Sequence, residues 1–200
     1  MNADRPRLPA EFVAAHKRRR MIEAMSELCA EQGFEATKIA DVVRRAHVAR
    51  KTLYDNFAGK EDLFLAAFDV TLADADAAVG AACDRVPPSD WEARTEAGLR
   101  ALLEHIAANP AAARLVLVEA PAAGPVAAAR YEAALDGFIE RLRDAAPNDG
   151  RKSTREEAVV GGTVWIVQRQ VRRGAAADAL ELLPELAEFV ISPYRGVGKR

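Results

Sequence analysis

The sequence predicts an all-α protein of about nine helices, and three observations lead to this fold class. Apolar residues recur three and four positions apart along almost the whole chain. No segment of four or more residues alternates apolar and polar side chains with the β-branched content of a strand. Alanine, which has the highest intrinsic helix propensity, is abundant throughout.

The first three helices are short or interrupted and have the spacing of a helix-turn-helix module. An amphipathic pattern over residues 11–32 ends at Gly33, where a left-handed cap is needed. Thr37 is the expected N-cap of a second helix. A connection of three residues, 47–49, then leads to a third helix of about seven residues.

Breakers and capping signals divide the rest of the chain into six further helices. A long helix is expected from Lys60, and Pro87 ends it. The segments Ser89–Glu92 and Ser153–Glu156 both read as capping boxes that open a helix. Pro184 is the expected first residue of the last helix.

The composition is that of a packed globular protein. Half of the 200 residues are apolar and 29% are charged, which is enough apolar surface for a core. The chain has no uninterrupted apolar run of about eighteen residues, the length that a membrane helix needs. Its first residues also lack the apolar stretch of a leader peptide. We therefore expect a cytoplasmic protein with no membrane partner.

The charge is distributed unevenly along the chain. Residues 1–60 carry twelve Lys and Arg against eight Asp and Glu, a net charge of +4. Because the whole chain carries −2, residues 61–200 carry −6. A basic front and an acidic remainder indicate different partners for the two parts.

The sequence contains no pattern that is typical of an enzyme. The three histidines, His16, His47 and His105, lack the spacing that places two metal ligands on one helix face. The pair Gly161-Gly162 lies within a helical pattern, and there is neither a glycine-rich phosphate loop nor a GxSxG elbow. We expect no metal, no cofactor and no catalytic residues.

The third helix has the properties of a DNA recognition helix. An α-helix fits the major groove if it has donors on one face and an apolar back. Arg50, Lys51 and Thr52 are the expected base contacts. Side chains suited to phosphate oxygens surround them, and these are Thr37, Lys38, Tyr54, Asn56 and Lys60. Each residue alone could belong to a solvated charged surface, but their joint spacing favours double-stranded DNA as a partner.

Four motifs extend this pattern over some forty residues. They are GFEAT at 33–37, DVVRRA at 41–46, TLY at 52–54 and KEDLF at 60–64. With these motifs, residues 21–64 resemble the DNA-binding domain of the TetR family of transcriptional regulators.

The resemblance implies a DNA-binding domain over residues 1–59 and a helical effector-binding and dimerisation domain over residues 60–200. It also implies a homodimer in which a small-molecule effector changes the separation of two recognition helices, which otherwise fit grooves about 34–36 Å apart. The expected function is that of a repressor that an apolar or amphipathic ligand releases from its operator.

Candidate residues in the larger domain are taken from aromatic, polar and valine-rich helix positions. The candidates for the ligand pocket are Phe68, Trp91, His105, Glu119, Tyr131 and Trp165. The candidates for the dimer interface are Val160, Val164, Val167, Leu186, Phe189 and Val190. An aromatic residue at helical spacing equally fits a packed core.

Two residues depart from the family pattern, which usually has Gly in the turn and Ser two residues later. Here these positions are His47 and Ala49. Histidine tolerates a left-handed backbone better than most residues, whereas alanine removes a hydroxyl that could cap the third helix, at a cost of about 1 kcal/mol.

Two other interpretations stay open at this point. The chain could be a helical small-molecule-binding protein or an enzyme whose front module does not read DNA. It could also be a DNA-binding protein with a collapsed pocket and no effector.

Overall fold

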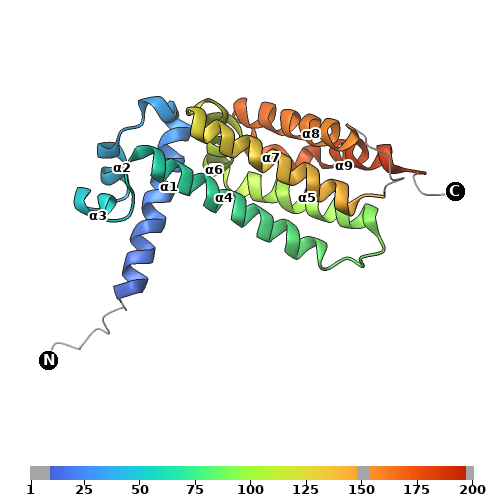
Figure 1. The fold of residues 1–200 in the computed structure, drawn as a ribbon, viewed down its shortest axis with the longest axis horizontal. Helices are drawn as coiled ribbons and strands as arrows, with labels where there is room; N and C mark the ends of the chain where they lie inside the picture. The colour runs from blue at the N-terminus through green and yellow to red at the C-terminus, as the bar shows by residue number, and fades with distance from the viewer. Residues whose placement is uncertain (1–9, 148–153, 197–200) are drawn as a thin grey trace. The chain divides into compact units, whose positions relative to one another are not determined.

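The structure is a computed structural model, and it describes residues 10–147 and 154–196. Within these residues the chain forms nine α-helices and no strand, which confirms the predicted all-α class (Figure 1). The chain divides into two compact units, Met1–Ala67 (unit 1) and Phe68–Arg200 (unit 2).

Unit 1 contains three helices and the start of a fourth. They are α1 (Ala10–Ala36), α2 (Ile39–Arg45), α3 (Arg50–Tyr54) and the first turns of α4 (Lys60–Cys83). Large apolar side chains from all four helices are buried between them, among them Met25, Val42, Leu53 and Phe64. These inward positions follow the predicted periodicity.

The corner between α1 and α2 differs in one detail from the prediction. Gly33 has φ 81°, so the chain bends there as expected. The N-cap of α2 is Lys38, however, and the expectation that Thr37 caps this helix is wrong. The Thr37 hydroxyl instead donates to the Gly33 carbonyl at 2.8 Å. The hydroxyl thus faces back toward α1, and no side chain caps the start of α2.

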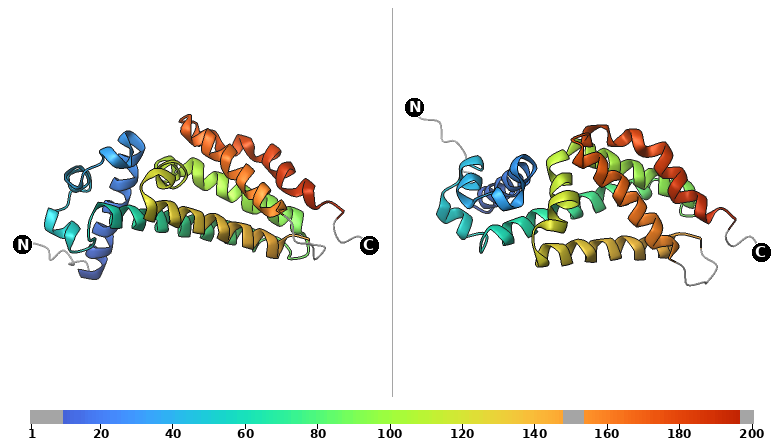
Figure 2. Two further views of the ribbon diagram at one scale, coloured as in Figure 1. Left: turned by 45° about the horizontal axis from the view of Figure 1, so that its top comes forward. Right: turned by 90° about the horizontal axis from the view of Figure 1, so that it is seen from above.

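The helices of unit 2 are longer and are joined by short irregular turns. They are the rest of α4, α5 (Trp91–Ala108), α6 (Pro110–Arg114), the π-helical turn η1 (Leu115–Glu119), η2 (Ala120–Ala122), α7 (Pro125–Ala145), α8 (Arg155–Arg172), η3 (Ala176–Leu182), α9 (Leu183–Ile191) and η4 (Ser192–Tyr194). Figure 2 shows α4, α5, α7, α8 and α9 running lengthwise through this unit.

Two of the helix-start signals are placed differently from the prediction. The N-cap of α5 is Asp90, whose carboxylate accepts from the backbone N–H of Ala93 at 3.0 Å, so Ser89 does not cap this helix. An ionised acceptor at this position also suits the helix dipole. Of the second box, Ser153 lies outside the described residues. Pro184 is the second residue of α9, which begins one residue earlier than predicted, at Leu183.

A buried polar pair fixes the C-terminal end of unit 2. The Tyr194 hydroxyl donates to Glu156 Oε1 at 3.1 Å, and both side chains are buried. The Trp91 ring covers Tyr194, with the ring centroids 5.0 Å apart. Burial raises the pKa of Tyr194, and the hydrogen bond to Glu156 raises it further. The hydroxyl therefore stays protonated at pH values well above those at which tyrosine usually titrates.

Over residues 10–147 and 154–196, no single helix is both long and apolar enough to cross a membrane. The segments Trp91–Ala108 and Pro110–Ala122 reach that composition only as a pair, and this pair is bent by 105°.

Candidate DNA-binding surface and ligand cavity

The expected recognition helix is short and is held from behind. It covers five residues, Arg50–Tyr54, and its inward side chain Leu53 is fully buried. Phe57, which follows the helix, is buried as well. Because the apolar back is anchored, the opposite face of α3 is presented to solvent. Arg50, Lys51 and Tyr54 are exposed there, and Thr52 is half-buried.

The exposed side chains of α3 are held only by contacts within the helix. Arg50 Nη2 lies 3.5 Å from the Tyr54 hydroxyl, and its guanidinium lies 5.7 Å from the centroid of that ring. Lys51 forms an ion pair with Asp55 at 3.0 Å. Such exposed pairs contribute little stability, so both cations can turn to a phosphate or a base at small cost.

Three of the predicted phosphate contacts already have partners inside unit 1. The Thr37 side chain is 1% exposed. Asn56 Nδ2 donates to the Thr52 carbonyl at 2.8 Å, which fixes the end of α3. Lys60 Nζ donates to the carbonyls of Phe34 and Glu35 at 3.0 and 3.3 Å. Lys38, in contrast, is exposed.

The turn before α3 has the backbone that the sequence predicted. His47 has φ 49°, in the left-handed region where family members usually have glycine, and this confirms the expected conformation. Its carbonyl accepts from Arg20 Nη2 of α1 at 3.4 Å. Ala49 occupies the N-cap of α3 with an extended backbone, the position where a serine hydroxyl could accept from the helix.

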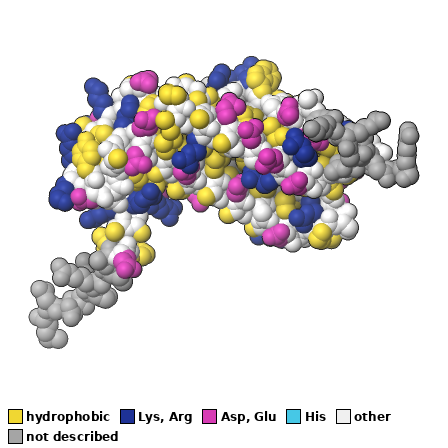
Figure 3. Space-filling view, viewed as in Figure 1, with side chains coloured by type: hydrophobic (Ala, Val, Ile, Leu, Met, Phe, Trp, Pro, Cys, Tyr) yellow, Lys and Arg dark blue, Asp and Glu magenta, His cyan; other side chains and the backbone are white. Residues whose placement is uncertain are grey.

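Lys and Arg side chains protrude from much of the face of unit 1 that Figure 3 shows. Several of them have acidic partners. Arg45 of α2 contacts Glu27 at 3.0 Å and Glu31 at 2.8 Å, both on α1. The hydrogen bond from Arg45 lowers the pKa of Glu31. These pairs join α1 to α2, so Arg45 has a structural role within the unit.

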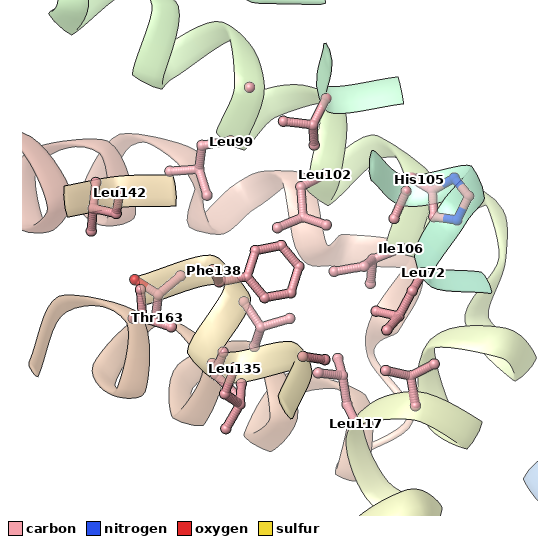
Figure 4. A pocket seen from close by; sticks show the side chains of 18 of the residues that line it. Leu72, Leu99, Leu102, His105, Ile106, Leu117, Leu135, Phe138, Leu142 and Thr163 are labelled. Atoms are coloured by element: carbon pink, nitrogen blue, oxygen red, sulfur yellow. The ribbon is translucent and has the colours of Figure 1, made fainter. Parts of the chain in front are cut away.

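Unit 2 contains an apolar cavity of about 310 Å³. Its walls are formed by α4, α5, α7 and α8, and single residues of α6 and α9 complete it. Figure 4 shows Leu142 and Thr163 at one end of the lining and Leu72, His105 and Leu117 at the other, with the Phe138 ring between them. A cavity of this size and character suits a small apolar ligand.

Two exposed ion pairs join α4 and α7, which both line the cavity. Arg130 contacts Asp69 at 3.0 Å, and Arg141 contacts Asp76 at 3.2 Å. From the first pair to the second, the residue number increases in both helices, so α4 and α7 run parallel along the cavity. The four side chains are on the outside, so the inner faces of both helices stay apolar.

The polar groups of the lining are few. Arg94 Nη1 donates to the carbonyls of Cys83 and Val86 at 2.8 and 3.0 Å, so its charge lies against the last carbonyls at the end of α4. Thr163 Oγ1 is buried and has no hydrogen-bond partner among the described residues. The lining therefore favours an apolar ligand segment over a charged group.

A π-helical turn shapes one wall of the cavity. In η1, Val116 and Leu117 line the cavity, and Gln168 of α8 donates its side-chain amide to the Leu117 carbonyl. Turns of this type are rare in proteins as a whole, and those that do occur often lie at functional sites. Four apolar residues followed by Glu119 give no sequence signal for it, so the sequence could not predict this feature.

The structure brings only part of the predicted pocket residues to the cavity. His105 and Tyr131 line it. The other four lie elsewhere. Phe68 is buried in the core, Trp91 covers Tyr194, Glu119 forms an ion pair with Arg114, and Trp165 is 57% exposed beneath the Arg169 guanidinium. Trp165 follows Val164 by one residue, so it lies about 100° away from the cavity face of α8.

The residues predicted for the dimer interface mostly face inward. Val160, Val164, Val167 and Val190 line the cavity, and Leu186 is buried in the core. Phe189 is 40% exposed. The valine stripe of α8 is thus its interior face, and the candidate contact surface moves to the outward face of α8 with Gly161 and Trp165.

Several cavity residues were not singled out from the sequence. The largest of these side chains are Leu99, Leu102, Leu135 and Phe138. The signal for them was an apolar stripe on each of α5 and α7. Such a stripe shows that a helix face is buried, but it does not distinguish a packed core from a cavity wall.

Across the described residues, no group of three or more His, Cys, Asp or Glu side chains is arranged to hold a metal ion. The fold and the two sites define a helix-turn-helix protein with a separate helical domain around an apolar cavity. Residues 21–67 match the family model described as bacterial regulatory proteins, tetR family. The resemblance predicted from the sequence is confirmed over these residues.

Solved structures with similar folds cover most of the chain. The fatty acid degradation regulator FadR from Bacillus halodurans has a TM-score of 0.76 at 17% identity, over 86% of this chain and 97% of its own. FadR from Bacillus subtilis, in complex with stearoyl-CoA, has a TM-score of 0.74 at 16% identity, over 87% and 97%. A TetR-like transcriptional regulator from Rhodococcus sp. RHA1 has 0.73 at 17%, over 95% and 100%. No curated protein matches the chain significantly.

The N-cap of α3 provides a test of the helix-turn-helix geometry. In Ala49→Ser the new hydroxyl can accept from the free N–H groups of the first turn, so we expect the unfolding free energy of unit 1 to rise by about 1 kcal/mol. Thermal unfolding followed by circular dichroism measures it. The control is Ala15→Ser, inside α1, where serine should destabilise by about half that amount. A gain of equal size in both variants would contradict the capping role.

Proposed function

We propose that the protein is a homodimeric transcriptional repressor that binds double-stranded operator DNA and is released by an apolar or amphipathic ligand. The observation that carries this proposal is the match of residues 21–67 to the tetR family. The anchored recognition helix and the apolar cavity agree with it, since one supplies a DNA contact and the other a place for an effector.

The exposed face of α3 assigns roles to the DNA contacts. Arg50 and Lys51 reach base edges in the major groove, with Thr52 beside them. Lys38 and Tyr54 contact phosphates from exposed positions. The other three predicted phosphate contacts already use part of their hydrogen-bonding capacity within unit 1. Lys60 and Asn56 each retain an N–H group for a phosphate, and Thr37 supports the corner from inside unit 1.

The outward face of α8 and α9 is the proposed homodimer contact. A Cβ on Gly162 would lie 2.7 Å from Phe189 Cζ, so the Phe189 ring packs directly on the backbone of α8. Gly161 is exposed beside it, and Trp165 follows one turn later. The exposed aromatic side chains of Phe189 and Trp165, beside two glycines that leave the backbone of α8 open, suit close packing against a second copy of the same face.

The cavity favours a ligand with a long apolar part. Its lining is formed mainly by Leu, Val, Ala and Phe side chains, and its one guanidinium is turned to backbone carbonyls. FadR from Bacillus subtilis, which has the same fold, binds stearoyl-CoA. We infer that an acyl chain or a similar hydrocarbon segment occupies the cavity here, while any charged head group remains near water.

A gel shift tests the DNA contacts. The probe is a duplex from the region upstream of the chain's own coding sequence, with a scrambled duplex of equal composition beside it. Lys51→Ala should lose about 1–3 kcal/mol on the upstream duplex and little on the scrambled one, whereas Lys38→Ala should weaken both equally. If the wild type shows no preference for the upstream duplex, the chain is instead a helical ligand-binding protein whose front module does not read DNA.

Filling the cavity tests the effector site. Leu102→Trp places a larger side chain in the cavity, so we expect the Kd for stearoyl-CoA, measured by calorimetry, to rise at least about tenfold, with stearate as a second probe. The control is Val126→Trp, at an exposed position of α7. Equal binding by both variants would place the ligand elsewhere. Absence of binding by the wild type would favour a regulator without an acyl effector.

Sedimentation velocity tests the dimer. Trp165→Glu puts a charge at the centre of the proposed contact, so we expect the protein to become monomeric at micromolar concentration. The matched control is Val126→Glu, which introduces the same charge at another exposed apolar position of unit 2. A dimer that survives Trp165→Glu with an unchanged dissociation constant would exclude this face.

A further inference from the structure

The first three turns of α1 stand out because nothing in unit 1 buries them. All residues from Glu11 to Arg19 are exposed. The segment carries His16, Lys17 and three consecutive arginines, and Glu11 is the only acid between residues 10 and 22. No role in the core or in the recognition helix explains this run of cations.

Two cations of this segment lie on the side of α1 that is buried further along the helix. Lys17 precedes the buried Met21 by four residues, and Arg18 precedes the buried Ile22 by four. Residues four apart share one helix face. Arg19 lies on another face, where it forms an ion pair with Glu23 at 2.8 Å.

Arginines of α1 reach both ends of the recognition helix. The Arg18 guanidinium lies 4.8 Å from the centroid of the Phe57 ring, three residues beyond the end of α3. Arg20 Nη2 lies 3.4 Å from the carbonyl of His47, three residues before α3 begins. Each arginine therefore lies close to one end of α3.

These cations remain available for an anion. Within the described part of unit 1, Arg19, Arg44, Arg45 and Lys51 form ion pairs with carboxylates, whereas Lys17, Arg18 and Arg20 do not. A guanidinium that lies over an aromatic ring still has N–H groups at its edge. Arg18 can therefore contact Phe57 and a phosphate oxygen together.

We propose that Lys17, Arg18 and Arg20 form a second DNA contact, which binds backbone phosphates beside the two ends of the recognition helix. The inference rests on the proposed DNA-binding function and adds a site to it. Contacts of this kind position a protein on the duplex without reading its sequence, and they release counterions.

The distribution of side chains favours DNA over an anionic membrane. A helix that lies on a membrane needs a continuous apolar face opposite its cations. The exposed apolar side chains here are Phe12 and Val13, which are adjacent in sequence and are followed at helical spacing by Ala15, His16 and Lys17. No apolar face results.

The test compares neighbouring arginines on different faces of the same helix. Arg18→Gln and Arg19→Gln change the charge equally, and binding to the upstream duplex is measured from 50 to 300 mM KCl. For Arg18→Gln we expect the slope of log K against log[salt] to fall by about 0.9 per lost contact and affinity to drop roughly eightfold at 0.1 M salt. Arg19→Gln should change neither clearly.

A conservative variant separates DNA contact from a structural role. Arg18→Lys keeps the charge but loses the planar group that lies on Phe57. Because the salt slope depends on the charge at the phosphate, the slope of Arg18→Lys should equal that of the wild type. If Arg18→Lys instead fails as Arg18→Gln does, and both lower the Tm, the arginine only supports α3 and the inference is overturned. Equal slopes for Arg18→Gln and Arg19→Gln would overturn it too.

Two outcomes separate this inference from the proposed function. If the wild type binds no duplex at any salt concentration, the proposed function fails and the inference fails with it. In the second outcome, the wild type binds the duplex, and Arg18→Gln binds it with the same salt slope. If Arg18→Gln then lowers binding to phosphatidylglycerol vesicles, the proposed function stands and the surface belongs to a membrane.

Discussion

The arrangement of unit 1 depends on the ammonium group of Lys60. It donates to the last carbonyls before the corner, those of Phe34 and Glu35, and lies 4.1 Å from the centroid of the Phe34 ring. A cation is favoured there because the C-terminal end of a helix carries partial negative charge. The contact joins the end of α1 to the start of α4. Along the chain, the short helix α3 lies between these two anchored segments. A five-residue helix could not keep its orientation alone.

The two faces of helix α8 differ, and each serves one part of the proposed function. Val160, Val164 and Val167 turn to the cavity, while Gly161 and Trp165 turn to solvent. A ligand that widens the cavity would displace the backbone that also carries the proposed contact with a second subunit. Coupling between the ligand and the dimer then needs no further element, since a rigid helix transmits a shift of one face to the other.

Local patterns explain why the helix-turn-helix module could be predicted and the cavity could not. The left-handed turn at His47 and the anchor Leu53 follow from spacing within a few residues, and the structure has both. Thr37 was misjudged because a hydroxyl can serve either of two adjacent helices, and sequence does not say which one it faces. Trp165 and Val164 differ by one position, and only long-range packing decides which of them reaches the interior.

Gly98 shows how closely the walls of unit 2 approach each other. A Cβ at this position would lie 3.0 Å from Cys83 Sγ and 3.3 Å from Val79 Cγ1, both on α4. The gap between α4 and α5 is thus set by the size of a hydrogen atom at one residue. In evolutionary terms, a single methyl group gained here would press on both α4 side chains and could alter the width of the cavity, without any change in unit 1.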